Sequence, residues 1–401
     1  MDFDDTAEEA AFRQEARSWL GRHARPLAPG AAPTTRSFYE MDDVFLSEGK
    51  AWQKALYDGG WAGIDWPARV GGRGGTPMEA VIFAEEENRF DVPQGLFAVA
   101  LGMAGPTLVA HGTPGQQERY LSAMLRGEEV WCQLFSEPGA GSDLASLSTR
   151  AERDGDTWVV NGQKVWSSGA HLADLGILLA RTDPSAPKHR GITFFVVDMA
   201  TEGVEVRPLR QMTGTSSFNE VFLTDVRLPD ANVVGRPGEG WRVAMTTLAN
   251  ERNVGVHSSP VPPLARLARE TGKATDPVVR QRLAALYARA EVMKYLGYRL
   301  QTALSQGRPP GPETSVLKLV FSSLATDAGE LAVSLQGMAA SVGGAGPAAF
   351  WQHQFLAAPS YRIAAGSDEI QRNLIAERVL GLPTEARPDK DLPFSALERP
   401  G

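Results

Sequence analysis

Two segments in the middle of the chain carry the residue types best suited to hold a ligand. The first, Ser136-Glu-Pro-Gly-Ala-Gly-Ser-Asp143, follows an apolar run and places glycines at 139 and 141. Glycine can take positive φ values and lets a backbone approach a ligand closely. We expect this turn to present N–H groups and the hydroxyls of Ser136 and Ser142 to an acceptor-rich partner.

The second segment places a tryptophan next to Ser167-Ser168-Gly169. Thr157 to Val160 is rich in β-forming residues, and Asn161-Gly162 is a strong two-residue turn signal. Gln163 to Trp166 would then be the returning strand. The pattern therefore predicts a hairpin that ends at Trp166. A β-domain without a ligand could have the same composition, so these residues alone leave both interpretations open.

A carboxylate suited to proton abstraction lies further along the chain. Ala244, Leu248, Glu251 and Gly255 share one helical stripe of otherwise small or apolar residues. A carboxylate in such surroundings needs a partner or a task. Stripe geometry alone favours an ion pair between Glu251 and an arginine over a role as general base.

Two further motifs have structural interpretations. Gly71-Gly-Arg-Gly-Gly75 lacks the lysine and hydroxyl of a nucleotide-binding loop, so we interpret it as a connection. Glu85-Glu-Glu87 is typical of a solvated helix face.

Hydrophobic periodicity divides the chain into regions that would position these side chains. Up to residue 125 apolar residues recur at helical spacing, from 126 to 235 short β-rich runs follow, and from 236 to 385 helical spacing returns. We predict an α+β fold that is mainly α, with an N-terminal helical domain, a small central β-domain and a C-terminal four-helix bundle. The charged, Pro-rich tail at 386–401 is predicted to be flexible.

The periodic segments can be placed along the chain. The N-terminal stripe consists of Phe12, Ala16, Trp19 and Leu20. Strands are expected at Ile177 to Ala180, Ile192 to Val197 and Glu220 to Leu223, and long C-terminal helices near 239–257, 277–306, 313–342 and 367–380.

The composition of the 401-residue chain argues against several classes of partner. Forty basic and 48 acidic residues give a net charge of −8, so there is no broad attraction to nucleic acid or an anionic membrane. We find no signal-peptide pattern and no apolar run of spanning length, and we expect a cytoplasmic protein without a metal site. The single cysteine, Cys132, lies in an apolar run and is expected to be buried and unreactive.

The segment from Trp131 to Ala170 is similar to the signature of acyl-CoA dehydrogenases. The similarity extends over almost the whole chain, through Ile370-Gln-Arg-Asn-Leu-Ile-Ala-Glu-Arg378. The resemblance implies the same order of α, β and α domains, with FAD between the β-domain and the C-terminal helices. It also implies that subunits assemble through those helices.

The resemblance assigns cofactor-binding positions residue by residue. Trp166 matches the tryptophan beside the isoalloxazine, and Ser168, next to Ser167, matches the hydroxyl near flavin N5. A serine replaces the commoner threonine at 136 and 168, which keeps the hydrogen-bond donor. The positions that match the segment holding the pyrimidine edge are Gln133, Leu134, Phe135, Ser136, Gly141 and Ser142, and the FAD-side residues near the C-terminal motif are Ser367, Asp368 and Glu369.

The resemblance also bears on the general base. Many family members have a glutamate immediately before the glycine of the C-terminal motif, where this chain has Ala365. The short-branched-chain and long-chain branches use a glutamate on the first helix of the C-terminal bundle, which matches Glu251. The resemblance thus assigns the base to Glu251, with Arg252 and Ser142 near the CoA ligand.

Two segments depart from the family pattern. Ala268-Arg-Glu-Thr-Gly-Lys273 lacks the phenylalanine-glycine step after the arginine that grips the FAD pyrophosphate of a neighbouring subunit, so Arg269 or Arg280 is a candidate replacement. Family members also carry a glutamine and a pair of glycines in the later helix and loop, where this chain reads Val333-Ser-Leu-Gln-Gly-Met-Ala339. The motifs that face the flavin thus match the family, whereas the motifs that would contact the FAD of a neighbouring subunit do not. This combination resembles subunits of actinobacterial α2β2 heterotetramers, and a homotetramer is the alternative.

The activity implied by the resemblance is FAD-dependent α,β-dehydrogenation of an acyl-CoA to the trans-2-enoyl-CoA, as in fatty acid β-oxidation. Glu251 would take the α-proton, flavin N5 the hydride, and an electron-transfer flavoprotein the electrons. Small residues at 364, 365 and 255 would leave room for a bulky acyl group. The alternatives are a flavin-dependent oxidase or desaturase of a carrier-bound thioester, and a non-catalytic partner subunit of a heteromeric dehydrogenase.

Overall fold

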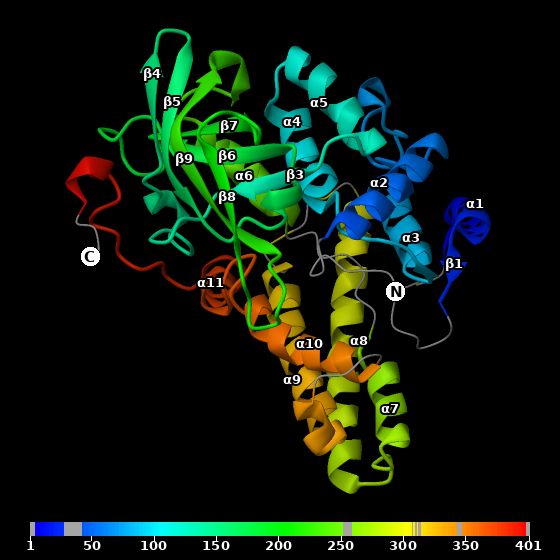
Figure 1. The fold of residues 1–401 in the computed structure, drawn as a ribbon. Coiled ribbons are helices and arrows are strands. Elements are labelled where there is room, and N and C mark those ends of the chain that lie inside the picture. Colours follow the sequence, from blue (N-terminus) through cyan, green and yellow to red (C-terminus); the bar gives the residue numbers. More distant parts are fainter. Residues whose placement is uncertain are drawn as a thin grey trace. The chain divides into compact units, whose positions relative to one another are not determined.

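The chain forms two compact units, each assembled from three separate stretches of sequence (Figure 1). The computed structural model describes residues 5–27, 42–251, 259–306, 308, 311, 314–342 and 347–397. The helical unit comprises Met1–Thr35, Gly75–Val92 and Arg252–Thr384, and the sheet unit comprises Arg36–Gly74, Pro93–Glu251 and Glu385–Gly401. The predicted class, mainly helical with a central β-region, is confirmed, while the domain boundaries stay predictions.

An eight-stranded sheet forms the centre of the sheet unit, in the order β10-β7-β6-β4-β5-β9-β8, with β3 pairing β6. Strands β6 and β7 are apolar along almost their whole length and buried on both faces, as expected of a central pair. The core includes Val160, Leu178, Phe195 and Val221. The strands are β3 (Trp131–Leu134), β4 (Arg150–Asp154), β5 (Thr157–Lys164), β6 (Leu175–Arg181), β7 (Ile192–Asp198), β8 (Val204–Leu209), β9 (Phe218–Pro229) and β10 (Val233–Val234).

The predicted hairpin turn at Asn161-Gly162 is wrong. Strand β5 continues through both residues because it pairs β4 on one side and β9 on the other, and the dipeptide produces a bulge in the β9 register. The Asn161 side chain accepts a hydrogen bond from the Asp225 N–H at 3.0 Å. A Cβ at Gly162 would collide with Thr149, so the glycine serves close packing.

Helices and short turns complete the sheet unit. Helix α6 packs against α4 and β7, which fixes its buried face on the sheet. In the glycine-rich connection, Gly71 and Gly74 have positive φ, and a Cβ at Gly72 would collide with the Trp66 backbone. The helices and turns are α2 (Asp43–Asp58), η2 (Ala68–Val70), η3 (Ala100–Ala104), α4 (Gly105–His111), α5 (Pro114–Arg126), η4 (Leu144–Ser146), η5 (Ala170–Leu172), η6 (Asp230–Asn232), α6 (Gly240–Glu251) and η9 (Phe394–Ala396).

Helix α9 is the centre of the helical unit and contacts α7, α8, α10 and α11. Two helices were not predicted, α7 and α10. Helix α7 has only ten residues, with prolines at its second and third positions, and α10 contains Pro359. Neither therefore shows a long apolar periodicity uninterrupted by proline. The elements are α1 (Ala7–His23), β1 (Arg25–Pro26), α3 (Pro77–Glu87), β2 (Phe90–Asp91), α7 (Val261–Glu270), α8 (Pro277–Ser305), α9 (Thr314–Gln336), η7 (Gly337–Ser341), α10 (Pro347–Tyr361), α11 (Asp368–Leu374) and η8 (Ile375–Val379).

The acidic cluster on α3 differs from its predicted solvated state. The Glu86 side chain is fully buried and receives hydrogen bonds from Arg17 at 2.8 Å and Arg13 at 3.2 Å. It therefore joins α3 to α1, whose predicted stripe from Phe12 to Leu20 is buried. Arg89, three residues on, also pairs with Glu86, but the two arginines that donate hydrogen bonds to it lie about seventy residues away in the chain, so the local pattern missed its burial.

The C-terminal tail also differs from expectation in part. Residues 394–396 form the turn η9, and the Phe394 side chain is buried. The charged residues 385–391 lie exposed, in line with their composition. Among the described residues, no helix is long and apolar enough to cross a membrane.

Candidate functional site

Three separate segments of the sheet unit meet around Trp166. The Val165 N–H donates to the Ser136 carbonyl at 2.9 Å, which joins the end of β5 to the segment after β3. The Ser167 N–H donates to the Asn219 carbonyl at 3.0 Å, and the Asn219 amide returns a bond to the Ser167 carbonyl at 2.9 Å. The structure therefore brings together the predicted positions 135–136 and 166–168.

Trp166 is both exposed and strained. Its side chain is 61% exposed, and its φ of 61° lies in the left-handed region that non-glycine residues avoid. The indole meets Phe218 edge to face, with ring centroids 6.0 Å apart. Such strain persists only where surrounding bonds hold it, and it is concentrated at ligand sites in proteins.

The serine hydroxyls around Trp166 are available for a ligand. Ser167 Oγ is buried and has no hydrogen-bond partner among the described residues. Ser136 and Ser168 are half-buried, Ser142 is exposed, and their hydroxyls make no hydrogen bond within the described parts of the chain. A buried hydroxyl without a partner costs free energy, and of these serines that applies to Ser167. The accessible hydroxyls of Ser136, Ser142 and Ser168 can donate to a polar ligand that supplies acceptors.

The side chains of the remaining predicted positions, on β3 and directly after it, are largely buried. Leu134 and Phe135 are buried, and the Phe135 ring meets Phe194 edge to face with centroids 5.8 Å apart. Gln133 is half-buried. Cys132 is fully buried as predicted, and burial raises the pKa of its thiol to about 12.

The turn that follows Ser136 is closed by backbone hydrogen bonds. Glu137 and Ala140 exchange two backbone hydrogen bonds of 3.1 and 3.0 Å across Pro138 and Gly139. Neither Gly139 nor Gly141 uses the positive φ values that glycine can take. A Cβ at either glycine would meet no atom of the described structure within 4 Å, so both face open space that a ligand can enter.

A buried ion pair that the sequence interpretation missed supports this turn. Lys164 Nζ lies 2.8 Å from Glu137 Oε1 and 3.0 Å from the Phe135 carbonyl oxygen. Glu137 also accepts bonds from the N–H groups of Ser148 and Thr149. Burial opposes the charge on Glu137, but Lys164 and these donors outweigh it and lower the pKa of Glu137 to about 2. Strand alternation could have found Lys164, which falls on the same face as Trp158 and Val160.

The predicted base lies at the end of α6. Ala244 is fully buried and Leu248 is half-buried, which agrees with an inward stripe on this helix. Glu251 is the last residue of α6, and its side chain lies outside the described structure, as do Arg252 and Gly255. The assignment of Glu251 therefore stays a prediction.

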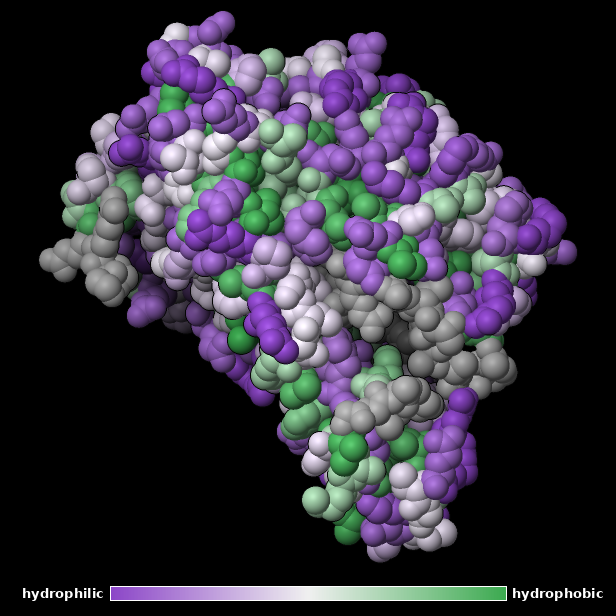
Figure 2. Space-filling model, in the orientation of Figure 1, coloured by the Kyte–Doolittle hydropathy of each residue, from purple (hydrophilic) through white to green (hydrophobic). Residues whose placement is uncertain are grey.

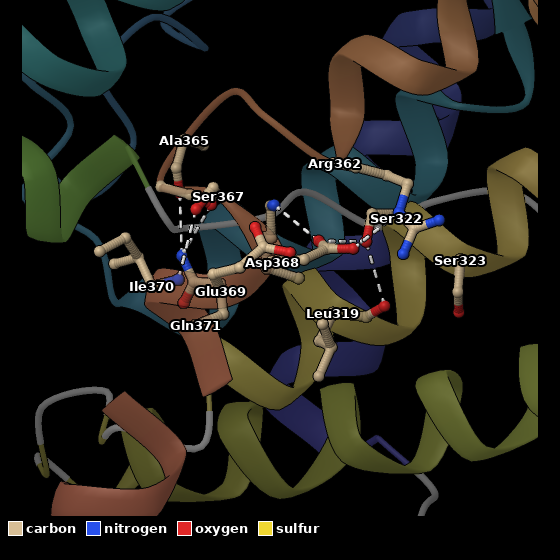
Figure 3. A network of polar contacts seen from close by, with 12 residues as sticks. Leu319, Ser322, Ser323, Arg362, Ala365, Ser367, Asp368, Glu369, Ile370 and Gln371 are labelled. Atoms are coloured by element: carbon tan, nitrogen blue, oxygen red, sulfur yellow. Dashed lines mark hydrogen bonds and ion pairs between the residues drawn. The ribbon is translucent and has the colours of Figure 1, made fainter. Parts of the chain in front are cut away.

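Asp368, predicted on the FAD side, is held inside the helical unit (Figure 3). Its carboxylate accepts bonds from Ser322 Oγ at 2.8 Å, Arg362 Nε at 2.9 Å and Lys318 Nζ at 3.1 Å. Burial would raise the pKa of Asp368, but these three donors together keep it below its usual value. Asp368 is thus an ionised anchor between α9 and the start of α11.

The neighbours of Asp368 form a rigid turn at the start of α11. Ala365 and Gly366 have consecutive positive φ values of 52° and 78°, and the Gln371 amide donates to both of their carbonyls at 3.0 and 3.2 Å (Figure 3). Ser367 caps the helix by accepting from the Ile370 N–H. The Glu369 side chain is 76% exposed and pairs with Arg372.

The two segments that depart from the family pattern touch each other in the helical unit. Lys273 Nζ donates to the carbonyls of Ser334 and Leu335 at 3.0 and 2.9 Å, where it caps the C-terminal end of α9. Arg269 and Arg280 are exposed at the end of α7 and the start of α8, and they make no side-chain contact within the described residues. Both arginines are therefore available to an anion.

Comparison with known families covers nearly the whole chain. Residues 6–128 match the N-terminal domain, residues 132–226 the middle domain, and residues 238–380 the C-terminal domain of acyl-CoA dehydrogenases.

Comparison with individual proteins gives similar results. The chain is 41% identical over 387 residues to acyl-CoA dehydrogenase IpdE1 of Mycobacterium tuberculosis, covering 94% of this chain and 98% of that protein. Its fold resembles the Tcur3481–Tcur3483 steroid ACAD, with a TM-score of 0.80 and 29% identity over 96% of this chain and 100% of the other. It also resembles the ChsE4–ChsE5 complex from Mycobacterium tuberculosis, with a TM-score of 0.78 and 31% identity over 96% of this chain and 100% of the other.

Proposed function

This chain belongs to the acyl-CoA dehydrogenase family of oxidoreductases, and we propose that it binds FAD and oxidises an acyl-CoA to the trans-2-enoyl-CoA. Family members are flavoproteins. The observation that carries the proposal is the strained, exposed Trp166 beside the unpartnered buried hydroxyl of Ser167. An exposed aromatic face next to free donors suits a flat, acceptor-rich ring system.

The proposed FAD site uses residues of the sheet unit. Ser136, Ser142 and the backbone around Gly141 would hold the pyrimidine edge, while Trp166 lies along the ring and Ser168 donates near N5. Bound FAD supplies the acceptor for the hydride. Ser367 and Glu369 of the helical unit, and an arginine at 269 or 280, are proposed as further FAD contacts. Asp368 is proposed to act there through the backbone that it anchors, because three donors already hold its carboxylate.

Glu251 is proposed as the base that takes the α-proton of the thioester. Two rival acids are disfavoured, since Asp368 is held ionised by three donors and Glu369 is exposed. The position before Gly366 holds Ala365, which has no proton acceptor. A carboxylate at the end of an otherwise small and apolar stripe suits abstraction of a weakly acidic proton, and Arg252 and Ser142 are proposed to hold the CoA portion.

We propose a bulky or branched acyl group as the substrate class. The similarity to a protein described as a steroid ACAD supports this, as do the small residues Ala364 and Ala365. A carrier-bound thioester and an oxidase activity are the alternatives. Rapid reoxidation of the reduced protein by oxygen would favour the oxidase, whereas transfer to an electron-transfer flavoprotein would favour the dehydrogenase.

We further propose that the chain works with a related subunit in an α2β2 assembly. The resemblance to the ChsE4–ChsE5 complex supports this. Large side chains on the helical unit remain exposed, among them Tyr287, Val292 and Tyr295 of α8. Figure 2 shows hydrophobic residues among polar ones on one face of the molecule. A related subunit packed against this unit would cover such side chains if they form one contiguous patch. A stable homo-oligomer of the purified chain with one FAD per subunit would contradict a heteromer.

The decisive experiment is an anaerobic titration of the FAD-loaded protein with a panel of acyl-CoAs, with and without candidate partner subunits. Glu251→Gln should retain FAD and lose substrate-dependent bleaching by at least about a hundredfold in rate. The matched control is Glu239→Gln, which changes a carboxylate just before the same helix that pairs with Arg242. Unchanged bleaching in the Glu251 variant would refute its role, and absence of FAD binding in all preparations would refute the flavin site.

A further inference from the structure

The C-terminal segment Pro393–Leu397 is docked on the loop between β6 and β7. The Phe394 N–H donates to the Ala186 carbonyl at 2.9 Å, and the Ser395 N–H donates to the Pro184 carbonyl at 2.9 Å. The Phe394 side chain is 6% exposed. Two backbone hydrogen bonds and a buried ring make this a specific contact and distinguish it from the exposed residues before it.

The Phe394 ring covers the guanidinium of Arg181, whose Cζ lies 3.7 Å from the ring centroid. Arg181 is the last residue of β6 and is 3% exposed. Its guanidinium donates to the carbonyls of Ala145 at 2.7 Å, Leu147 at 3.2 Å and Lys188 at 2.6 Å. An aromatic face attracts a guanidinium and excludes water, which strengthens the hydrogen bonds made by the same group.

Two of the three carbonyls that the Arg181 guanidinium holds, those of Ala145 and Leu147, belong to the stretch directly after Ser142. This stretch, residues 143–149, is also fixed at its first residue and at its last two. Lys188 Nζ donates to Asp143 at 2.8 Å, and Glu137 accepts from the N–H groups of Ser148 and Thr149 at 2.7 and 2.9 Å. Arg181 supplies the central attachment, and Phe394 covers it.

We propose that Pro393–Leu397 is a positioning element of the ligand site, in which Phe394 acts through Arg181 to fix the backbone of residues 143–149 next to Ser142. The nature of the ligand at Ser142 rests on the proposed function, whereas the positioning itself does not. Phe394 and Arg181 touch neither cofactor nor thioester in this proposal. They set the geometry of the turn that does.

The first test measures the turn without any ligand. Hydrogen exchange of flavin-free protein is followed at the Ser146 and Leu147 amides, which donate within the turn to Asp143 and Leu144. Phe394→Ala should accelerate their exchange about tenfold, and Phe394→Leu, which keeps an apolar side chain but no aromatic face, should give a smaller increase. Leu392→Ala is the matched control, since Leu392 is an exposed apolar residue of the same tail. Equal exchange in the Phe394→Ala and control proteins would overturn the proposal.

The second test measures catalysis in the FAD-loaded protein. Phe394→Ala should raise KM for an acyl-CoA about tenfold and change kcat less than about threefold, because the reacting groups are untouched. A fall in kcat at constant KM would overturn the positioning role at Ser142. If the unaltered protein binds no FAD with or without candidate partner subunits, the proposed function fails, and the exchange experiment alone still decides whether the tail positions the turn.

A double-mutant cycle identifies the route through Arg181. Arg181→Lys keeps the charge but loses the planar guanidinium whose two terminal nitrogens bond the three carbonyls, so it should accelerate exchange as Phe394→Ala does. The double variant should be no worse than the poorer single variant if both residues act through one contact. Additive effects would overturn the assigned route. Phe394→Leu with Arg181→Lys repeats the cycle if the alanine variant does not fold.

Discussion

Lys164 Nζ lies 2.8 Å from Glu137 Oε1, with the two side chains 0% and 5% exposed. The pair joins strand β5 to the turn that begins at Ser136, and the same ammonium also holds the Phe135 carbonyl. The backbone that carries the proposed flavin contacts is therefore fixed from within the sheet unit by one buried charge pair.

Lys164→Met should destabilise the protein by about 3–5 kcal/mol, because it leaves the Glu137 carboxylate buried without its counter-charge. Urea unfolding monitored by circular dichroism measures this loss. The double variant Lys164→Met with Glu137→Gln should recover part of it, since no unpaired charge remains. A loss below about 1 kcal/mol in the single variant would show that the pair is not needed for stability.

Acid should weaken the fold through Glu137. Its pKa is about 2 in the folded protein against 4.5 for the ordinary carboxyl. The unfolded chain therefore binds more protons between these values, so the stability from Glu137 is complete above about pH 4.5 and is lost as the pH falls towards 2. The free energy of unfolding of Glu137→Gln, measured over this range, should fall less steeply than that of the unaltered protein. Parallel slopes would contradict the lowered pKa.

Trp166→Gly should separate stability from binding. Glycine relieves the positive φ, so we expect the flavin-free protein to gain about 1 kcal/mol, while its affinity for FAD falls. Trp166→Phe is the control, because it keeps a ring and the backbone strain. Thermal unfolding and flavin fluorescence titration measure the two effects. A loss of stability in the glycine variant would mean that the exposed indole contributes more packing than its exposure indicates.

Asp368→Ala should destabilise the helical unit by about 3 kcal/mol, since the buried Lys318 ammonium and the Ser322 hydroxyl lose their acceptor. The neighbouring change Glu369→Ala removes an exposed carboxylate and should stay within about 0.5 kcal/mol. Chemical denaturation of the two variants in parallel gives the comparison. Similar losses in both would indicate a general effect at the start of α11.

The parts of the fold that follow local patterns could be predicted from the sequence. The helical stripe from Phe12 to Leu20 is buried, Cys132 is buried, and the β-rich runs at 177–180, 192–197 and 220–223 lie in strands β6, β7 and β9. Each depends on a periodicity that is complete within one element. The assignment of the flavin-binding positions depended instead on the family resemblance, because an ordinary loop can contain the same glycines and serines.

The features that were missed depend on partners distant in the chain. Asn161-Gly162 has the composition of a turn, but pairing with β9 on one side and β4 on the other keeps it in a strand. Arg13 and Arg17, which donate to Glu86, and the ring that covers Arg181 lie on other elements, so no local pattern predicts these contacts. Glu251 and Arg252 remain predictions, since their side chains lie outside the described structure.

The contact between Phe394 and Arg181 also sets an order of events during synthesis. The sheet unit takes its last stretch from residues 385–401, whereas β6 ends at residue 181. When all eight strands have been synthesised, Phe394, whose ring covers the Arg181 guanidinium, has not yet been added to the chain. The contact between Phe394 and Arg181 can therefore form only after residue 394 has emerged, when all the strands of the sheet have already been synthesised.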